Sequence, residues 1–310
     1  MIKFVAMIFS LIVCVDGKPH IRSSSSESDK CWMFMHLQKS GGSTVKTIIN
    51  DTWKSKSNLY DSVQWKYGES FNKGYSNNIP YKWNVIEGGY VESLRGVVTE
   101  KNCKWFTVFR DPVSRLVSAY EYCKKASKDQ TCASNVHNAR DLDIVSFAKH
   151  WGNYALRQFV LNMVSWDTVI DHLTSESGRN LTQEYISESS GWYLMKLYLE
   201  DIGGDSGEAL SDFLQPVKDL LDTEYSAVGI LEKFDETLTL FNEALDMPSM
   251  DWHEKFEEDG KKNVHHTSVT DIMREAMDSS EIMEYLRLDI LLYEHAVEVF
   301  NRQAVWYGIE

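Results

Sequence analysis

The segment "HLQKSGGSTVKTIIN", residues 36–50, carries most of what the sequence says about the fold. The apolar run "CWMFM" (31–35) leads into it, and a helical pattern begins near Thr44. Glycines let the backbone approach a ligand closely, and the first amides of a helix attract anions. Lys39 stands just before the two glycines and adds a full positive charge. The segment therefore predicts a strand, an anion-binding loop and a helix.

The order of residues in this loop differs from that of the ATPase phosphate loop. The ATPase pattern G-x-x-x-x-G-K-[ST] places the lysine after the glycines and a hydroxyl on Mg²⁺. Here Lys39 precedes Gly41 and Gly42. A nucleotide kinase is therefore a weak hypothesis for this chain. Gly-Gly turns also precede helices as simple connections, so the loop alone does not decide the function.

A second segment, "FRDPVSRLVSAY" (109–120), strengthens the prediction of an anion site. It follows the continuous apolar run "KWFTVF" (104–109), which is typical of a strand buried on both faces. Pro112 ends that strand and opens a helix. Arg110 and Ser118 offer a guanidinium fork and a hydroxyl to a second phosphate. Two such elements indicate a nucleotide that carries phosphates at two positions.

Strand and helix patterns alternate along the chain. Strand patterns recur in "WNVIEGGY" (83–90) and "YSAVGILEKF" (225–234), and "EIMEYLRLDILLYEHAVEVFNRQ" (281–303) predicts a long amphipathic helix. The alternation favours an α/β fold, with a mainly parallel sheet, helices on both faces and a helix-rich C-terminal half. Ligands of such sheets bind at the carboxyl ends of the strands. Both motifs follow strands, so we expect them to form one site.

The pair "HLQKSGGST" and "FRDPVSRLVSAY", in this order, resembles the two donor-binding motifs of the membrane-type carbohydrate sulfotransferases. That family contains the heparan sulfate 2-O- and 6-O-sulfotransferases and the galactose 3-O-sulfotransferases. The segments "YSAVGILEKFDETLTLF" and "LDILLYEHAVEVF" are similar to later parts of the same family, so the resemblance covers roughly residues 31–302. It implies a P-loop NTPase-like parallel sheet and the donor 3′-phosphoadenosine 5′-phosphosulfate (PAPS).

The resemblance also implies roles for individual residues. Lys39 would stabilise the leaving phosphate oxygen while a sulfuryl group passes in line to a glycan hydroxyl, without a metal. Arg110 and Ser118 would bind the 3′-phosphate. The late segment "KKNVHH" resembles a loop that covers the donor, which makes Lys262 a further phosphate contact; a solvated basic turn is the alternative. The 5′-phosphosulfate would be bound by Lys39, Ser40, Gly41, Gly42, Ser43 and Thr44.

The acceptor hydroxyl requires a general base. Many relatives have a histidine after a glycine in the segment that matches "IEGGYVESL", where this chain has Gly89. Glu87 is the substitute base that we expect, because other sulfotransferases use a glutamate, and Glu92 is the second candidate. A solvated carboxylate at a turn is the alternative interpretation. The absent histidine also favours a second hypothesis, a catalytically silent glycan- or nucleotide-binding protein that retains the fold.

Charge restricts the partners. The 310 residues include 32 Lys and Arg against 46 Asp and Glu, a formal net charge of −14. Nucleic acid is therefore not an expected partner, because phosphate backbones require a basic surface. The acceptor is expected to be a glycan or another hydroxyl compound. The spacing of histidines and acidic residues shows no zinc or calcium signature.

The N-terminal segment predicts entry into the secretory pathway. Residues 1–17 contain Lys3 and an apolar run typical of a signal peptide, with a short membrane anchor as the alternative. Residues 18–30 include "SSSSESD" and predict a flexible polar stalk before a single domain at 31–310. The expected location is the Golgi lumen or the outside of the cell.

This route permits disulfides and N-glycans. We expect Cys123 to pair with Cys132 across a short polar turn. Cys31 and Cys103 each begin an apolar run and would bridge if their strands are neighbours; otherwise they are buried thiols. The acceptor sites for N-glycans are Asn50 and Asn180, in "NDT" and "NLT".

Overall fold

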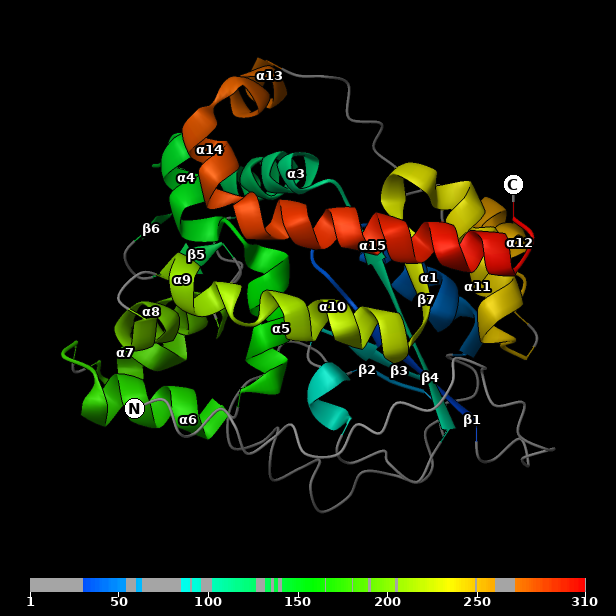
Figure 1. Ribbon diagram of the computed structural model, residues 1–310, viewed down its shortest axis with the longest axis horizontal. Coiled ribbons are helices and arrows are strands. Elements are labelled where there is room, and N and C mark those ends of the chain that lie inside the picture. The colour runs from blue at the N-terminus through cyan, green and yellow to red at the C-terminus, as the bar shows by residue number, and fades with distance from the viewer. Residues whose placement is uncertain are drawn as a thin grey trace.

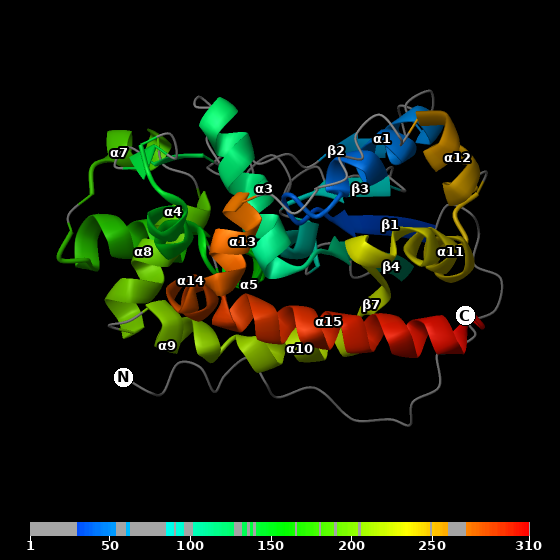
Figure 2. The same cartoon turned by 90° about the horizontal axis from the view of Figure 1, so that it is seen from above.

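The chain forms an α/β structure in which helices cover both faces of one parallel sheet (Figures 1 and 2). The computed structural model describes residues 30–53, 60–62, 85–89, 91–95, 102–126, 132–134, 137–138, 141–164, 166–179, 181–188, 191–203, 206–248, 250–259 and 271–309. The predicted signal peptide, nearly all of the predicted stalk, Lys262 and Asn180 lie outside the described residues.

The described strands of the main sheet all run parallel, as the alternation of patterns predicted. Their order across the sheet is β2-β3-β1-β4-β7. A separate antiparallel pair is formed by β5 and β6. The strands are β1 (Lys30–Met35), β2 (Tyr60–Ser62), β3 (Val85–Gly88), β4 (Asn102–Phe109), β5 (Ala133–Ser134), β6 (His137–Asn138) and β7 (Tyr225–Ile230).

The direction in which the strands are added changes between β1 and β4. From β1 the chain passes to β2 and β3 on one side of the sheet, then returns to β4 on the other side of β1 and continues to β7. Such a switch point separates the two loops that leave the neighbouring strands, and it opens a crevice at their carboxyl ends. The loops that leave β1 and β4 carry the two motifs identified in the sequence.

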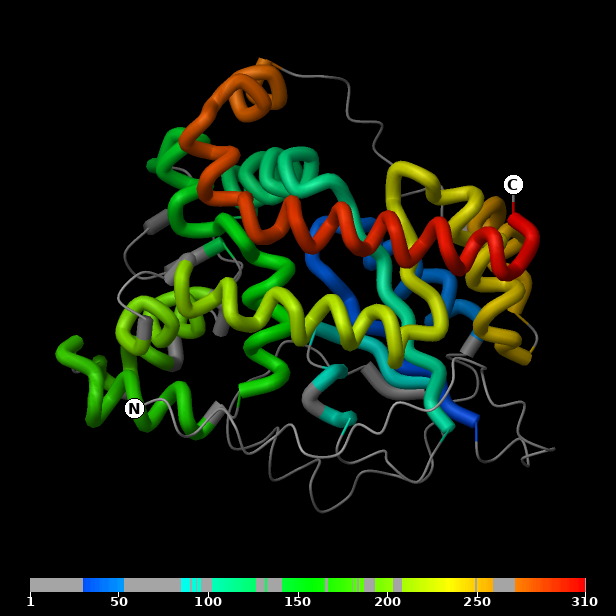
Figure 3. Tube along the Cα trace, viewed as in Figure 1, coloured from blue at the N-terminus to red at the C-terminus, as the bar shows by residue number. Residues whose placement is uncertain are grey.

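Most of the other described residues are helical, and the helices of the C-terminal half lie around the sheet (Figure 3). Helices α1 and α12 lie over one face, while α10 and α15 lie over the other (Figure 2). The helices are α1 (Gly42–Trp53), α3 (Pro112–Lys125), α4 (Ile144–Trp151), α5 (Tyr154–Met163), α6 (Trp166–Asp171), α7 (Gln183–Glu188), α8 (Gly191–Gly203), α9 (Ser206–Ser211), α10 (Leu214–Thr223), α11 (Phe234–Leu245), α12 (Trp252–Asp259), α13 (Asp271–Asp278), α14 (Ser280–Tyr285) and α15 (Arg287–Trp306), with short turns η4 (Val91–Leu94), η5 (His172–Glu176) and η6 (Leu231–Lys233).

The core is centred on aromatic side chains of the middle strands. The ring of Phe106 on β4 lies 5.0 Å from that of Phe34 on β1 and 5.3 Å from that of Phe241 on α11, measured between centroids. All three are fully buried. On the same side, Trp32 Nε1 donates a 2.8 Å hydrogen bond to the main-chain oxygen of Leu245. These contacts hold α11 against one face of the sheet. Consecutive residues of β1 and of the second half of β4 are buried, so these strands are covered on both faces, as their continuous apolar sequence predicted.

The predicted C-terminal helix over 281–303 is interrupted at Leu286, which separates α14 from α15. The interruption has a tertiary cause. Asn153 Oδ1 accepts hydrogen bonds of 3.0 Å from the main-chain N–H groups of both Leu288 and Asp289. This side chain satisfies amides of the first turn of α15 from outside, which is the role of a helix cap.

Two disulfides lie within the described residues. The predicted bond between Cys123 and Cys132 is present. Cys31 and Cys103, whose state the sequence left open, are also bonded, because they face each other in the register of β1 and β4. Disulfides are typical of proteins that mature in an oxidising compartment, such as secreted and lumenal proteins. No helix in the described part of the chain has both the length and the apolar character needed to cross a membrane.

Candidate functional site

The two predicted anion-binding motifs lie side by side at the carboxyl edge of the sheet. β1 and β4 are paired neighbours, and the loop after each begins at this edge. Arg110 Nη1, at the end of β4, donates a 3.2 Å hydrogen bond to the main-chain oxygen of Lys39. The structure therefore brings Lys39 and Arg110 together. Burial lowers the pKa of Arg110, while the nearby carboxylate of Glu232 opposes that change.

The backbone of the first loop requires its glycines. Gly41 has a φ of +81°, a region that favours glycine, and Lys39 also has a positive φ of 62°. At Gly42 the constraint is space, because a Cβ would lie 1.9 Å from the imidazole ring of His36. The loop thus folds back over the end of its own strand, with His36 packed beneath the start of α1.

His36 is held neutral in this position. Burial lowers its pKa most, the positive charges of Lys46 and Lys39 act in the same direction, and together they bring the pKa to about 3. A neutral imidazole next to two lysines adds no repulsion to an already positive region. Because the ring packs against Gly42, His36 shapes the loop.

The ammonium group of Lys39 faces α3. Its Nζ lies 4.4 Å from the centroid of the Tyr122 ring, which is a cation–π contact. Ser118 is half-buried one helical turn before Tyr122, so the two side chains share a face of α3. Lys39 and Ser118 therefore border the same side of that helix.

Not every predicted amide donor is available. The Thr44 amide donates a 3.0 Å hydrogen bond to the Gly41 carbonyl and so closes the first turn. Ser43 is exposed, whereas Ser40 is buried and lines a small cavity together with Arg110.

Glu87, the predicted base, lies at the end of β3 and is fully buried. Its Oε1 lies 3.2 Å from Nζ of Lys46, which comes from the second turn of α1. The carboxylate is therefore paired with Lys46 and closed off from solvent. Lys46 stands inside the segment 36–50, but no motif in the sequence assigned it a role.

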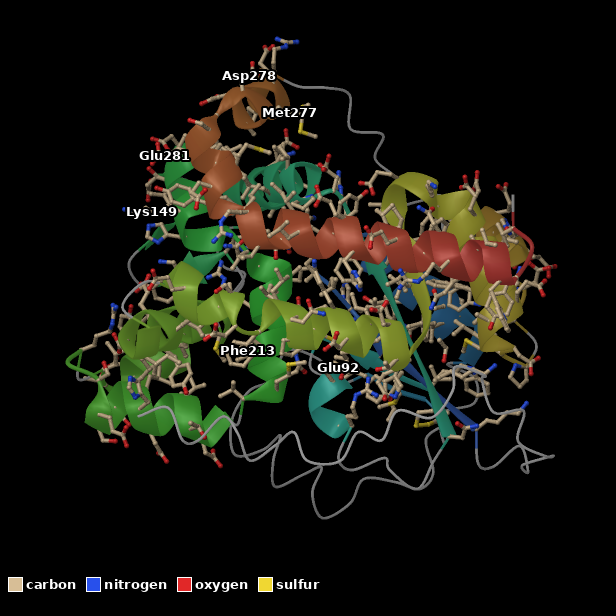
Figure 4. All side chains as sticks on the ribbon, viewed as in Figure 1. Glu92, Lys149, Phe213, Met277, Asp278 and Glu281 are labelled. Carbon is tan, nitrogen blue, oxygen red and sulfur yellow. A yellow bond between two sulfur atoms is a disulfide. The ribbon has the colours of Figure 1, made fainter. Side chains whose placement is uncertain are left out.

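Glu92, the second candidate base, belongs to a structural network on η4 (Figure 4). Its two oxygens accept hydrogen bonds of 3.0 and 2.9 Å from Arg95, and Tyr225 donates its hydroxyl to the same carboxylate at 2.6 Å. Burial and the Glu92 charge raise the pKa of Tyr225 well above its ordinary value. The Glu92 carboxylate holds η4 against β7, and its oxygens already accept hydrogen bonds from Arg95 and Tyr225.

The backbone of Gly89, where the family resemblance led us to expect a histidine, is tied to α5. The main-chain oxygen of Gly89 accepts hydrogen bonds of 3.1 Å from both Gln158 Nε2 and Asn162 Nδ2. Gln158 Nε2 also donates to the main-chain oxygen of His36 at 2.9 Å. One side chain thus joins the ends of β1 and β3, a role that nothing in the local sequence signalled.

Of the two predicted N-glycan acceptors, only Asn50 lies within the described residues. Asn50 is half-buried within α1, and the hydroxyl of Thr52 in the same acceptor triplet donates to the main-chain oxygen of Ile48. In the described ranges, no cluster of three or more His, Cys, Asp or Glu side chains is arranged to hold a metal ion.

Comparison with known proteins finds local similarity only. No family model matches the chain. A segment of 147 residues is 30% identical to non-structural protein 1 of a human rotavirus A isolate and covers 46% of this chain but 28% of that protein. A bovine rotavirus A non-structural protein 1 is 27% identical over 158 residues, which covers 47% of this chain and 31% of that protein. The match thus spans less than a third of the length of these curated relatives.

Proposed function

We propose that this protein is a sulfotransferase that moves a sulfuryl group from PAPS to a hydroxyl of a glycan acceptor. The observation that supports it most directly is the contact between the two anion-binding motifs. Arg110 bonds to the main chain of Lys39 at the switch point of the sheet, where ligands of parallel sheets bind. A single donor that carries phosphates at two positions would contact both motifs, because both lie at the carboxyl edge of the sheet.

The proposal includes a P-loop NTPase-like fold. The strand order β2-β3-β1-β4-β7 supports this, because the glycine loop follows a central strand and leads directly into α1. The arrangement lets backbone amides and the positive end of α1 act together on an anion.

In the proposed reaction, the acceptor oxygen attacks sulfur and the bond between sulfur and the bridging phosphate oxygen breaks. That phosphate oxygen takes the electron pair and becomes negative. The Lys39 ammonium stabilises this charge, while Arg110 and Ser118 bind the 3′-phosphate and fix the donor. This role requires Lys39 to leave Tyr122, a contact worth about 0.5–1 kcal/mol at exposed sites. Lys262 remains a proposed donor contact.

The proton of the acceptor hydroxyl goes to Glu87 in this scheme. Glu87 is paired with Lys46. An anionic donor next to α1 would attract Lys46 and release the carboxylate, which links base activation to donor binding. The paired state protects a buried carboxylate until the donor arrives.

A second candidate is a catalytically silent protein that binds a nucleotide or glycan. Gly89 supports it, since its carbonyl is fixed by Gln158 and Asn162 and it has no side chain to act as a base. Full burial of Glu87 supports it as well. For either function we propose a location in the secretory pathway, Golgi lumen or outside the cell, which the disulfides support.

The deciding experiment measures binding and transfer on one preparation. Calorimetry with adenosine 3′,5′-bisphosphate, the donor product, should show one site per chain, with adenosine 5′-monophosphate as the weaker control. Transfer of ³⁵S from labelled PAPS to a panel of neutral and acidic glycans should then occur. Nucleotide binding without any transfer favours the silent protein. Absence of nucleotide binding refutes the sulfotransferase and the nucleotide-binding form of the second candidate.

A further inference from the structure

The carboxyl ends of β1 and β3 are joined by one side chain of α5. Gln158 is 1% exposed, and its Nε2 donates to the main-chain oxygens of His36 at 2.9 Å and of Gly89 at 3.1 Å. A primary amide carries two hydrogens on its nitrogen, so both are used. The His36 amide in turn donates to the Gly88 oxygen at 3.0 Å. Both main-chain polar groups of His36 are therefore fixed relative to the end of β3.

From His36 the contacts continue into the glycine loop. The His36 ring is buried, and a Cβ on Gly42 would lie 1.9 Å from it, so the ring and the loop are in direct contact. Close-packed interiors have low compressibility and transmit strain, so a displaced side chain moves its neighbours. A shift of the His36 main chain therefore reaches Gly42, the first residue of α1.

The same helix returns to the end of β3. Lys46, on α1, places its Nζ 3.2 Å from Oε1 of Glu87, which is buried two residues before Gly89. Contacts thus run from the segment of Glu87 through Gln158 and His36 to α1, and from α1 back to Glu87. Packed side chains, hydrogen bonds and rigid elements of this kind carry energetic coupling between separate parts of a protein.

A neighbouring side chain distinguishes the attachment of α5 from this connection. Asn162, one helical turn after Gln158, donates its Nδ2 to the same Gly89 oxygen at 3.1 Å. Asn162 therefore also attaches α5 to the end of β3. Gln158 differs because its second hydrogen bond goes to His36, at the end of β1. Loss of the Asn162 amide should loosen one strand end, and loss of the Gln158 amide should loosen two.

We propose that Gln158 is a positioning residue that couples the segment carrying Glu87 to the glycine loop. The consequence for catalysis rests on the proposed function: a donor bound at the glycine loop then orders the segment of the proposed base. Coupling between two sites is reciprocal, so an ordered base segment also favours the donor.

Hydrogen exchange followed by mass spectrometry tests the coupling on the full chain without a ligand. Gln158→Met keeps a side chain of similar length that donates no hydrogen bond. Residues 36–46 and 85–89 should then both exchange about 2–10-fold faster, the value of one hydrogen bond, relative to residues 225–230 of β7. Asn162→Ala is the matched control and should speed exchange in 85–89 alone. Gly42→Ala perturbs the other end, and its clash with His36 should also speed exchange in 85–89.

Nucleotide and transfer measurements test the link to catalysis. Adenosine 3′,5′-bisphosphate should slow the exchange of residues 85–89 in the wild type and not in Gln158→Met. The kcat of transfer by Gln158→Met should fall about 10–100-fold, whereas KM for PAPS should change much less, because the proposed base is misplaced while the donor contacts remain.

The two parts of the experiment fail separately. A wild type that neither binds the nucleotide nor transfers sulfate refutes the proposed function, while the exchange measurements without ligand still decide the coupling. The inference is overturned if Gln158→Met speeds the exchange of residues 36–46 no more than Asn162→Ala does, or if Gly42→Ala leaves residues 85–89 unchanged. Bound nucleotide that does not protect residues 85–89 in the wild type overturns it as well.

Discussion

Arg110 Nη1 donates a 3.2 Å hydrogen bond to the main-chain oxygen of Lys39, across 71 residues of sequence. The bond joins the loop after β1 to the loop after β4. A guanidinium that holds the backbone of Lys39 also fixes the direction from which the Lys39 side chain leaves the loop. In the proposed enzyme, the 3′-phosphate contact and the position of the catalytic lysine are therefore coupled.

Replacing Arg110 should weaken nucleotide binding. Arg110→Ala removes a charged partner of the 3′-phosphate, so the affinity for adenosine 3′,5′-bisphosphate should fall about 10–100-fold. Arg110→Lys should not restore it, because an ammonium lacks the planar fork. Calorimetry measures the effect, with Arg274→Ala on the exposed face of α13 as control. Equal affinities in the Arg110→Ala and control proteins would contradict the assignment.

Replacing Lys39 should act on the rate of transfer. Lys39→Ala should lower the turnover of labelled sulfate by about a hundredfold, corresponding to roughly 3 kcal/mol of transition-state stabilisation. Unfolding stability should change little, since the side chain makes a half-exposed contact with Tyr122. The matched control is Lys218→Ala on α10. Unchanged turnover in Lys39→Ala would remove the lysine from the mechanism.

A methyl group at Gly42 should destabilise the loop through His36. The added Cβ would lie 1.9 Å from the ring, so Gly42→Ala should lower the free energy of unfolding by about 1–3 kcal/mol. In a His36→Ala background the same change should cost much less, because the space is free. Urea unfolding of the four proteins of this double-mutant cycle checks the prediction. Additive effects would show that the two residues are not in contact.

The free energy of unfolding should decrease as the pH is lowered, over a pH range defined by the pKa of His36. Its pKa is about 3 in the folded chain, below the ordinary value of 6.5, so between these values the unfolded state binds a proton that the folded state does not. Stability therefore decreases as the pH falls from 6.5, with a slope of up to about 1.4 kcal/mol per pH unit from this group. His36→Gln should show a shallower decrease in urea unfolding between pH 7 and 4. Parallel curves for the two proteins would contradict this origin.

Breaking the pair between Lys46 and Glu87 should be costly. Lys46→Met removes the ammonium that lies beside the fully buried Glu87 carboxylate, and unfolding stability should fall by about 3–5 kcal/mol. Adding Glu87→Gln should recover much of the loss, because the buried negative charge that Lys46 balances is removed. Thermal unfolding of the single and double variants measures it. If the double variant is no more stable than Lys46→Met, the charge is not the cause.

Patterns in consecutive residues were sufficient to predict the strand, loop and helix starts that form the candidate site. The glycine loop, the strand that precedes it and the helix that starts at Pro112 have strong signals in consecutive residues. The structure begins α1 at Gly42, close to the predicted start, and ends β4 at Phe109, one residue before the predicted end at Arg110. The edge strand β2 was not recognised, because Tyr60–Ser62 is short and stands in a stretch without clear periodicity.

The parts that depend on distant partners required the tertiary structure. Glycine spacing, apolar periodicity and a proline at a helix start act over a few residues, so the sequence already contained the parallel α/β arrangement and the two anion-binding motifs. The pair of Arg115 with Asp289 spans 174 residues, and Asn153 caps a helix 135 residues away. Burial, charge compensation and the cavity at Ser40 arise only when separate elements pack, because the energy of a polar group depends on the partners and the solvent around it.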